Sequence, residues 1–166
     1  EKYGLTINIR IGLHSGDMSV GNMGSEQVFS YTVMGDNVNL GSRLEGVNNL
    51  YGTSILVSEA TKAAAGSNFF FRELDRVMVK GKEESVRIYE LMSKHPSTTD
   101  EQDWMSKFSE ARSAYAEGNW AKAEGLLQEC LLKYPDDRAA KALLERMEQL
   151  QKPPKDWDGV WKIESK

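Results

Sequence analysis

A strand-like run passes into a helix-like run within the stretch Tyr31-Thr-Val-Met-Gly-Asp-Asn-Val-Asn-Leu-Gly-Ser-Arg-Leu-Glu45. The run 28–34, rich in β-branched and aromatic residues, predicts a strand that ends at Gly35. We expect Asp36 to be the N-cap of the helix that follows, because its carboxylate can accept hydrogen bonds from the free N–H groups of the first turn. That helix should bury a stripe of apolar residues spaced i, i+4, i+7 and i+11, namely Leu40, Leu44, Val47 and Tyr51.

Further strands are expected on both sides of this stretch. Residues 5–13 alternate in polarity and predict a strand with one apolar face, made of Ile7, Ile9, Ile11 and Leu13. Residues 14–17 should turn the chain, so that 18–23 returns as a hairpin partner of 5–13. Additional elements are predicted as strands over 54–57, 69–79 and 85–92, and as a short helix over 58–65 that Ser58 caps and Gly66 ends. This order of elements predicts an α+β fold.

The composition of the chain changes near Lys94. All four prolines and all four tryptophans lie beyond it, whereas eleven of the fourteen glycines lie before it. We therefore expect four parts in the chain. They are an α+β part over 1–94, a linker over 95–102, helices over 103–151 and a tryptophan-containing tail over 152–166.

The second part should form helices that pack onto a neighbour. Three apolar stripes at helical spacing start at Trp104, Trp120 and Ala140. The pattern Ala111-x2-Ala114, Ala123-x3-Leu127, then Pro135, follows the tetratricopeptide repeat, with Ala in place of its Tyr and Leu in place of its Phe. One repeat is too short to fold alone. Beyond it, Trp157, Val160 and Trp161 are expected either to dock over the exposed part of the sheet or to fray as a terminus.

Charge and composition exclude several classes of function. The 166 residues carry 21 Lys and Arg against 25 Asp and Glu, a net charge of −4, which does not favour a nucleic-acid partner. The single cysteine, Cys130, excludes an internal disulfide, and we expect a buried thiol on the apolar face of a helix. Two histidines do not support a histidine zinc site. The chain starts at Glu1 without Met, so we expect a piece of a longer protein.

Most polar motifs of the first part are interpreted as turns. His14 and Ser15 are neighbours on a strand and point to opposite faces, so they should not form a nucleophile–base pair. Gly21-x-x-Gly24 lacks the Gly-Lys-Ser/Thr of a phosphate loop. Asp17 is interpreted as a turn residue. No Asp/Glu pair has the spacing of a metal site, so no metal ligand is predicted.

Asn39 and Arg43 are the strongest candidates for chemistry. They lie i and i+4 on one helix face beside the apolar stripe. An amide and a guanidinium aimed in one direction can hold a hydroxyl and a phosphate oxygen together. Taken alone, the pair favours a solvated helix edge over a binding site. In the same way, Lys80-Gly-Lys82 taken alone is a charged hairpin tip.

Five motifs in order resemble the C-terminal half of a class III nucleotidyl cyclase catalytic domain, a ferredoxin-like α+β fold. They are Arg10-Ile-Gly-Leu-His-Ser-Gly16, Gly21-Asn-Met-Gly24, the stretch 31–45, Val79-Lys-Gly-Lys82 and Ile88-Tyr-Glu-Leu91. The segment Pro153-Pro-Lys-Asp-Trp-Asp-Gly-Val-Trp161 also resembles the C-terminal extension of bacterial membrane-anchored adenylyl cyclases.

The resemblance implies roles for four residues. The family makes a cyclic nucleotide and pyrophosphate as a dimer, with two divalent metals, Mg²⁺ or Mn²⁺, held by two aspartates. Asn39 occupies the position that orients the ribose, and Arg43 the position that stabilises charge on the α-phosphoryl group. Lys80 matches the lysine that meets the terminal phosphates. Thr32 matches the base-reading position and favours ATP, because its hydroxyl can accept a hydrogen bond from the adenine 6-amino group.

The metal aspartates and the phosphate-binding turn of the family are not in this sequence. The leading hypothesis is therefore a fragment of a homodimeric bacterial adenylyl cyclase, a lyase, with the fragment inactive by itself. Thr32 disfavours the alternative, a guanylyl cyclase. A further alternative is an inert cyclase-like scaffold whose helical tail binds a protein partner. The resemblance of 153–161 implies a cytoplasmic domain of a membrane-anchored protein.

Overall fold

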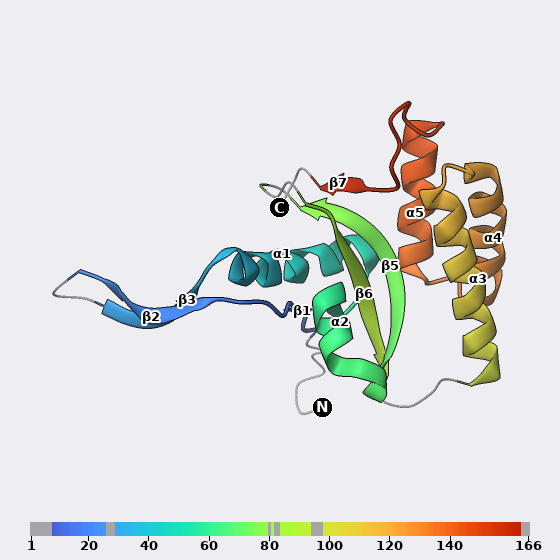
Figure 1. Ribbon diagram of the computed structural model, residues 1–166. Helices are drawn as coiled ribbons and strands as arrows, with labels where there is room; N and C mark the ends of the chain where they lie inside the picture. Colours follow the sequence, from blue (N-terminus) through green and yellow to red (C-terminus); the bar gives the residue numbers. More distant parts are fainter. Residues whose placement is uncertain (1–7, 26–28, 80, 82–83, 94–97, 164–166) are drawn as a thin grey trace.

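The protein combines a mixed β-sheet with helices (Figure 1), and the computed structural model describes residues 8–25, 29–79, 81, 84–93 and 98–163. The strands are β1 (Ile11–Leu13), β2 (Ser19–Gly24), β3 (Phe29–Met34), β4 (Ile55–Ser58), β5 (Phe70–Val79), β6 (Val86–Ser93) and β7 (Trp161–Ile163). The helices are α1 (Asp36–Tyr51), α2 (Glu59–Ala65), α3 (Thr99–Ala116), α4 (Trp120–Lys133) and α5 (Arg138–Leu150), with a short 3-10 turn over Gly66–Asn68. The predicted α+β class is confirmed.

Five strands form the main sheet in the order β1-β4-β6-β5-β7. The central strands β4, β6 and β5 pair antiparallel, whereas β1 joins β4 and β7 joins β5 in parallel. Strands β2 and β3 form a separate antiparallel sheet. We call this hairpin the arm. It projects away from the rest of the molecule in Figure 1.

The predicted hairpin between 5–13 and 18–23 is wrong, because β1 pairs with β4 and β2 pairs with β3. The segment between β1 and β2 is held against two helices instead of reversing. His14 hydrogen-bonds through Nδ1 to Ser58 Oγ (2.7 Å) and through Nε2 to Asn37 Oδ1 (3.0 Å). Asn37 Nδ2 in turn donates to the Asp17 carbonyl oxygen (2.7 Å). These contacts carry the chain past α1 into the arm.

Helix α1 buries the stripe that was predicted for it, and Leu40, Leu44, Val47 and Tyr51 are all buried. The N-cap prediction is wrong. Gly35 is the N-cap, with φ +129°, and Asp36 is the first helical residue. A glycine suits this strand-to-helix turn because other residues rarely adopt that φ. The charge of Asp36 still favours the positive end of the helix dipole.

Helix α1 lies directly against β1. A Cβ on Gly12 would lie 2.6 Å from the Gly41 carbonyl oxygen, so only glycine permits this approach. Asn48, which is buried, donates from Nδ2 to the Ile11 carbonyl oxygen (3.0 Å). The helix and the edge strand therefore form one unit.

The three helices predicted for the second part are confirmed, and we call α3, α4 and α5 the helical extension. Helix α3 begins at Thr99, earlier than predicted, because Thr98 and Glu101 form a capping box there. The predicted linker 95–102 is therefore too long at its C-terminal end, while 95–97 lie outside the described residues. The tetratricopeptide assignment of this extension stays a prediction.

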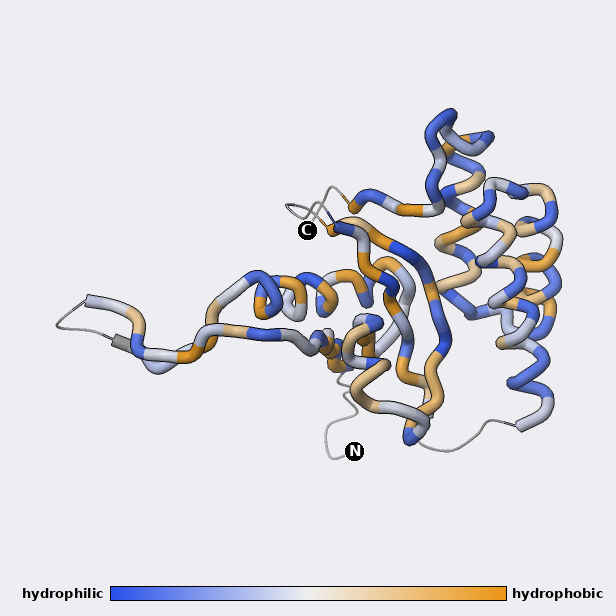
Figure 2. The backbone as a smooth tube through the Cα atoms, viewed as in Figure 1, coloured by the Kyte–Doolittle hydropathy of each residue, from blue (hydrophilic) through white to orange (hydrophobic). Residues whose placement is uncertain are grey.

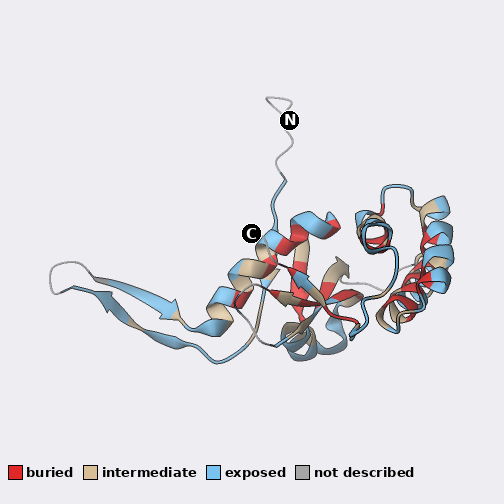
Figure 3. Cartoon of the chain, turned by 90° about the horizontal axis from the view of Figure 1, so that it is seen from above, coloured by how far each residue is buried: buried red, intermediate tan, exposed pale blue. Residues whose placement is uncertain are grey.

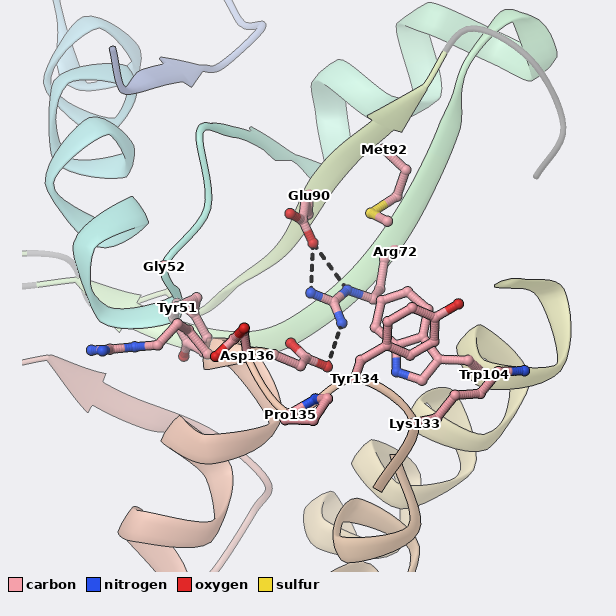
Figure 4. Close-up of a pocket in the computed structure, with 12 residues that line it drawn as sticks. Tyr51, Gly52, Arg72, Glu90, Met92, Trp104, Lys133, Tyr134, Pro135 and Asp136 are labelled. Carbon is pink, nitrogen blue, oxygen red and sulfur yellow. Dashed lines mark hydrogen bonds and ion pairs between the residues drawn. The ribbon is translucent and has the colours of Figure 1, made fainter. Parts of the chain in front are cut away.

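The helical extension shares its hydrophobic core with the sheet. Arg72 of β5 pairs with Glu90 of β6 (2.7 Å), as Figure 4 shows. It also pairs with Asp137 at the start of α5 (2.8 Å). The Arg72 guanidinium also lies over the Trp104 ring of α3, 4.6 Å from its centroid. Cys130 is buried, as predicted, and burial raises the pKa of its thiol to about 11.

The tail docks rather than frays, but as a strand. Trp157 Nε1 donates to the Tyr115 carbonyl oxygen (3.0 Å), and its ring meets the Trp120 ring edge-on at 5.7 Å. Val160 is buried, and Trp161 begins β7. The tail covers the edge of β5, at the opposite end of the sheet from β1.

Apolar residues before and within β1 stay exposed, as do several on the arm. Ile9, Ile11 and Leu13 are 67%, 40% and 42% exposed, and Ile7 lies outside the described residues. Hydrophobic positions recur along the arm in Figure 2, and Figure 3 shows the arm exposed along most of its length. Among the described strands, β1 has a neighbour on one side only. Within the residues described, the outer edge of β1 is therefore open.

We predict that the isolated chain self-associates through this edge, because unpaired strand edges with exposed apolar residues form templates for pairing. Light scattering over a concentration series should give a mass above the monomer value of 18.7 kDa. Ile11→Lys should reduce the association, since a charge blocks edge pairing. A monomer at high concentration with cooperative unfolding would contradict this prediction.

Arg72→Met should destabilise the fold strongly, because it leaves the carboxylates of Glu90 and Asp137 unpaired in a largely buried site. Removing one partner of a buried ion pair typically costs ~3–5 kcal/mol. Arg10→Met is the matched control, because Arg10 and Glu45 are about half exposed and such surface pairs contribute ~0–1 kcal/mol. Urea unfolding measures both variants, and equal losses would disprove a structural role for Arg72 at this junction.

Candidate functional site

The N-terminal half of α1 carries two asparagines, Asn37 and Asn39, whose side chains have different surroundings. The side-chain oxygen of Asn37 hydrogen-bonds to His14, and its side-chain nitrogen donates to the Asp17 carbonyl oxygen, so Asn37 is structural. Asn39 lies two residues further, about 200° around the helix, and is exposed. Within the described residues its side-chain amide has no hydrogen-bond partner. The amide of Asn39 is therefore available to a ligand or to another chain.

Arg43 lies one turn along the same face and carries an unsatisfied donor. Its Nη1 atom is buried, and among the described residues it has no hydrogen-bond partner. A buried guanidinium nitrogen without an acceptor is costly, and such groups usually have a functional explanation. Arg43 and Asn39 together present an amide and a cationic donor on one edge of α1, as predicted.

The β5–β6 turn lies close to Arg43. A Cβ on Gly81 would lie 3.5 Å from Arg43 Nη2 and 3.8 Å from Nη1. Gly81 has φ +73°, which fits a tight hairpin tip. Lys80 lies outside the described residues, whereas Gly81, next to it in the sequence, lies beside the guanidinium.

Thr32 lies on the arm rather than on α1. It is exposed and pairs in register with Gly21 across the two strands. A Cβ on Gly21 would have no heavy atom within 4 Å, so the space beside Thr32 is open. Gly35 alone separates the last residue of β3 from the first residue of α1. The arm and the Asn39–Arg43 edge are thus joined through a single glycine.

The residues of this site do not fit a divalent metal. Mg²⁺ and Mn²⁺ prefer carboxylate oxygens, whereas Asn39, Arg43 and Thr32 supply an amide, a cation and a hydroxyl. Across residues 8–25, 29–79, 81, 84–93 and 98–163, no group of three or more His, Cys, Asp and Glu side chains could hold a metal ion. In the same part of the chain, no helix has the length and apolar composition needed to cross a membrane.

A separate cavity of about 340 Å³ lies between the sheet and the helical extension (Figure 4). Arg72 and Glu90 line it and are paired with each other. Trp104 Nε1 is buried there without a partner among the described residues. The cavity contains none of the predicted site residues, so it is distinct from the Asn39–Arg43 edge.

Sequence reasoning missed a buried polar cluster at the other end of α1. We call Arg146, Tyr51, Asp75, Tyr115 and Trp161 the Arg146 cluster. Its members come from α5, α1, β5, α3 and β7. Arg146 and Tyr51 alone are 95 positions apart along the chain, so no local spacing could reveal the cluster. The only signal was an arginine inside the apolar stripe of a predicted helix.

A family model described as Adenylate and Guanylate cyclase catalytic domain matches residues 1–93. The match covers more than half of the 166 residues. The chain therefore belongs to this family.

Two adenylate cyclases are among its similar relatives. Adenylate cyclase 1 of Rhizobium meliloti (strain 1021) is 43% identical over 83 residues, which is 50% of this chain and 12% of that protein. Adenylate cyclase of Anabaena cylindrica is 39% identical over 88 residues, which is 51% of this chain and 18% of that protein. The chain thus spans less than a fifth of either relative.

Two solved structures are also similar to part of the chain. The adenylyl cyclase CyaB from P. aeruginosa is 32% identical, with a TM-score of 0.48, over 60% of this chain and 49% of that chain. The guanylyl cyclase Cya2 is 31% identical, with a TM-score of 0.45, over 53% of this chain and 44% of that chain.

Proposed function

We propose that this chain is the carboxyl-terminal half of an adenylyl cyclase catalytic domain followed by a helical extension. The intact enzyme would convert ATP to cyclic AMP and pyrophosphate. One observation carries the proposal: α1 places on one edge the exposed Asn39 amide and the Nη1 atom of Arg43, which has no hydrogen-bond partner among the described residues. Similarity to adenylate cyclases of two bacteria supports ATP as the substrate.

Arg43 and Asn39 would act during attack of the ribose 3′-oxygen on the α-phosphorus. In that step a bond forms between these two atoms, the 3′-hydroxyl loses its proton, and the bond to the β-phosphate oxygen breaks as pyrophosphate leaves. Arg43 would donate to the α-phosphoryl oxygens, on which charge increases in the transition state. Asn39 would hydrogen-bond the ribose and orient its 3′-oxygen. Lys80, beside Gly81, would meet the terminal phosphates.

Thr32 would read the base from the arm. Its hydroxyl can accept a hydrogen bond from the adenine 6-amino group, which guanine lacks. The open space opposite Gly21 supports this role, because a ring can approach there without meeting a side chain. A guanylyl cyclase is the second candidate, and the matched family, which includes guanylate as well as adenylate cyclase catalytic domains, is the observation that keeps it open.

The described residues supply half of such a site. Divalent metals, when bound, would activate the 3′-hydroxyl and neutralise the triphosphate, but the carboxylates for them must come from outside the described residues. We propose a homodimer in which each site combines the metal-binding half of one protomer with the Asn39–Arg43 edge of the other. The ferredoxin-like fold of the intact domain belongs to the same proposal.

The helical extension and the location of the protein are further parts of this proposal. The resemblance of residues 153–161 supports a cytoplasmic domain of a membrane-anchored bacterial enzyme. The Ala111, Ala123 and Pro135 pattern supports a tetratricopeptide-like extension with a protein partner.

In the intact enzyme, Asn39→Ala and Arg43→Ala should each lower kcat by about 10²–10³-fold with little change in KM for ATP, because both groups act mainly in the transition state. Formation of cyclic AMP measures this. Asn49→Ala and Arg10→Ala are the controls. Both are exposed residues that contact each other at the surface, and neither substitution should alter kcat.

An unchanged kcat in both site variants would contradict the proposal and indicate that Asn39 and Arg43 only form a solvated helix edge. The isolated chain provides a second control. With ATP and Mn²⁺ it should form no cyclic AMP above a protein-free blank, and turnover by this chain alone would contradict the half-site proposal.

Thr32→Ala should lower the preference of the intact enzyme for ATP over GTP more than it weakens binding of the triphosphate. The loss of one discriminating hydrogen bond costs roughly 1–3 kcal/mol. Ser30→Ala, on the same face of β3, should leave the preference unchanged. The ratio of kcat/KM values for the two nucleotides measures this, and comparable values in the unmodified enzyme would exclude the adenylyl assignment.

A further inference from the structure

One guanidinium of the helical extension contacts the end of α1. Arg146 of α5 is buried, and its Nη2 donates to the Tyr51 hydroxyl (2.9 Å). Its Nη1 pairs with Asp75 Oδ2 of β5 (2.5 Å) and donates to the Tyr115 hydroxyl of α3 (3.2 Å). The Trp161 ring of β7 lies over the same guanidinium, 4.3 Å from centroid to Cζ. Five elements therefore meet at Arg146.

Tyr51 is the residue through which α1 enters this cluster. It is the last residue of α1, it is buried, and its hydroxyl donates to Asp75 Oδ2 (2.6 Å). Burial, and then the charge of Asp75, raises the pKa of Tyr51 well above its ordinary value. The phenol therefore stays protonated and keeps donating to Asp75 while it accepts from Arg146.

A second contact packs the helical extension against the same end of α1. Gly52 is the C-cap of α1 with φ +63°. A Cβ on Gly52 would overlap Cβ and Cγ of Arg138, the first residue of α5. The start and the middle of α5 thus meet the end of α1, at Gly52 and Tyr51.

We propose that Arg146 and Tyr51 are positioning residues, through which the helical extension sets the direction of α1 and hence the placement of Asn39 and Arg43. The inference rests on the proposed function of that pair. At a rise of about 1.5 Å per residue, Asn39 lies about 18 Å from Tyr51 along α1. A tilt of about 5° at the Tyr51 end moves Asn39 by about 1.6 Å, and misplacement by about 1 Å can cost about 10²-fold in rate.

Two variants, each lacking one hydroxyl group that contacts the Arg146 guanidinium, distinguish an effect on the position of α1 from an effect on stability. Tyr51→Phe removes the hydroxyl that joins Arg146 to α1, and Tyr115→Phe removes the hydroxyl that joins it to α3. Both keep the aromatic ring. In the intact enzyme, Tyr51→Phe should lower kcat about 10-fold with KM for ATP unchanged, because α1 loses a contact that fixes its direction. The pair of Arg146 with Asp75 remains and limits the loss. Tyr115→Phe should leave kcat within about twofold.

Hydrogen exchange gives a readout that needs no activity. Amides of residues 36–43 should exchange faster in Tyr51→Phe than in the unmodified enzyme and in Tyr115→Phe, while melting temperatures show that both variants fold. Equal kcat and equal exchange in the two variants would overturn the proposal. If the unmodified enzyme makes no cyclic AMP, the proposed function fails instead, and the exchange difference alone decides the coupling.

Discussion

The buried pair of Arg146 and Asp75 is the contact on which the arrangement of this molecule depends. Bringing two charges out of water is unfavourable unless each finds further partners. Here Asp75 also accepts from Tyr51 and from the backbone N–H of Arg76 (2.7 Å), and Arg146 also meets Tyr115 and Trp161. Satisfying both charges therefore requires α1, the sheet, the helical extension and the tail to be in place together.

Local patterns predicted the elements of the fold well. The stripe of α1 and the stripes of the three later helices are buried because their spacing follows the helical period, which depends on neighbouring residues alone. Strand pairing was predicted less well. The partner of β2 depends on where His14 and Asn37 direct the chain, and these contacts join residues 23 positions apart. Contacts between residues close in sequence determine whether a segment is a helix or a strand. Contacts between residues far apart in sequence determine which element it packs against.

The candidate site divides in the same way. Asn39 and Arg43 could be predicted because they lie on one helix and match a family motif, and the structure adds that Arg43 Nη1 is buried without an acceptor among the described residues. The separation of Asn37 from Asn39 could not be predicted, since the sequence shows two similar asparagines and only the fold assigns one to His14. The Arg146 cluster could not be predicted either, because only the fold brings its residues together.

The shared core has a consequence for where this domain ends. Similarity to the family stops at residue 93, yet the hydrophobic core runs on to Ile163. The segment that matches the family and the segment that contributes to the hydrophobic core therefore end at different residues. A protein cut at the end of the family match would keep every residue of the Asn39–Arg43 edge and lose the partners of Arg72, Tyr51 and Asp75 in the extension. Domain boundaries drawn from similarity alone would divide this core in two.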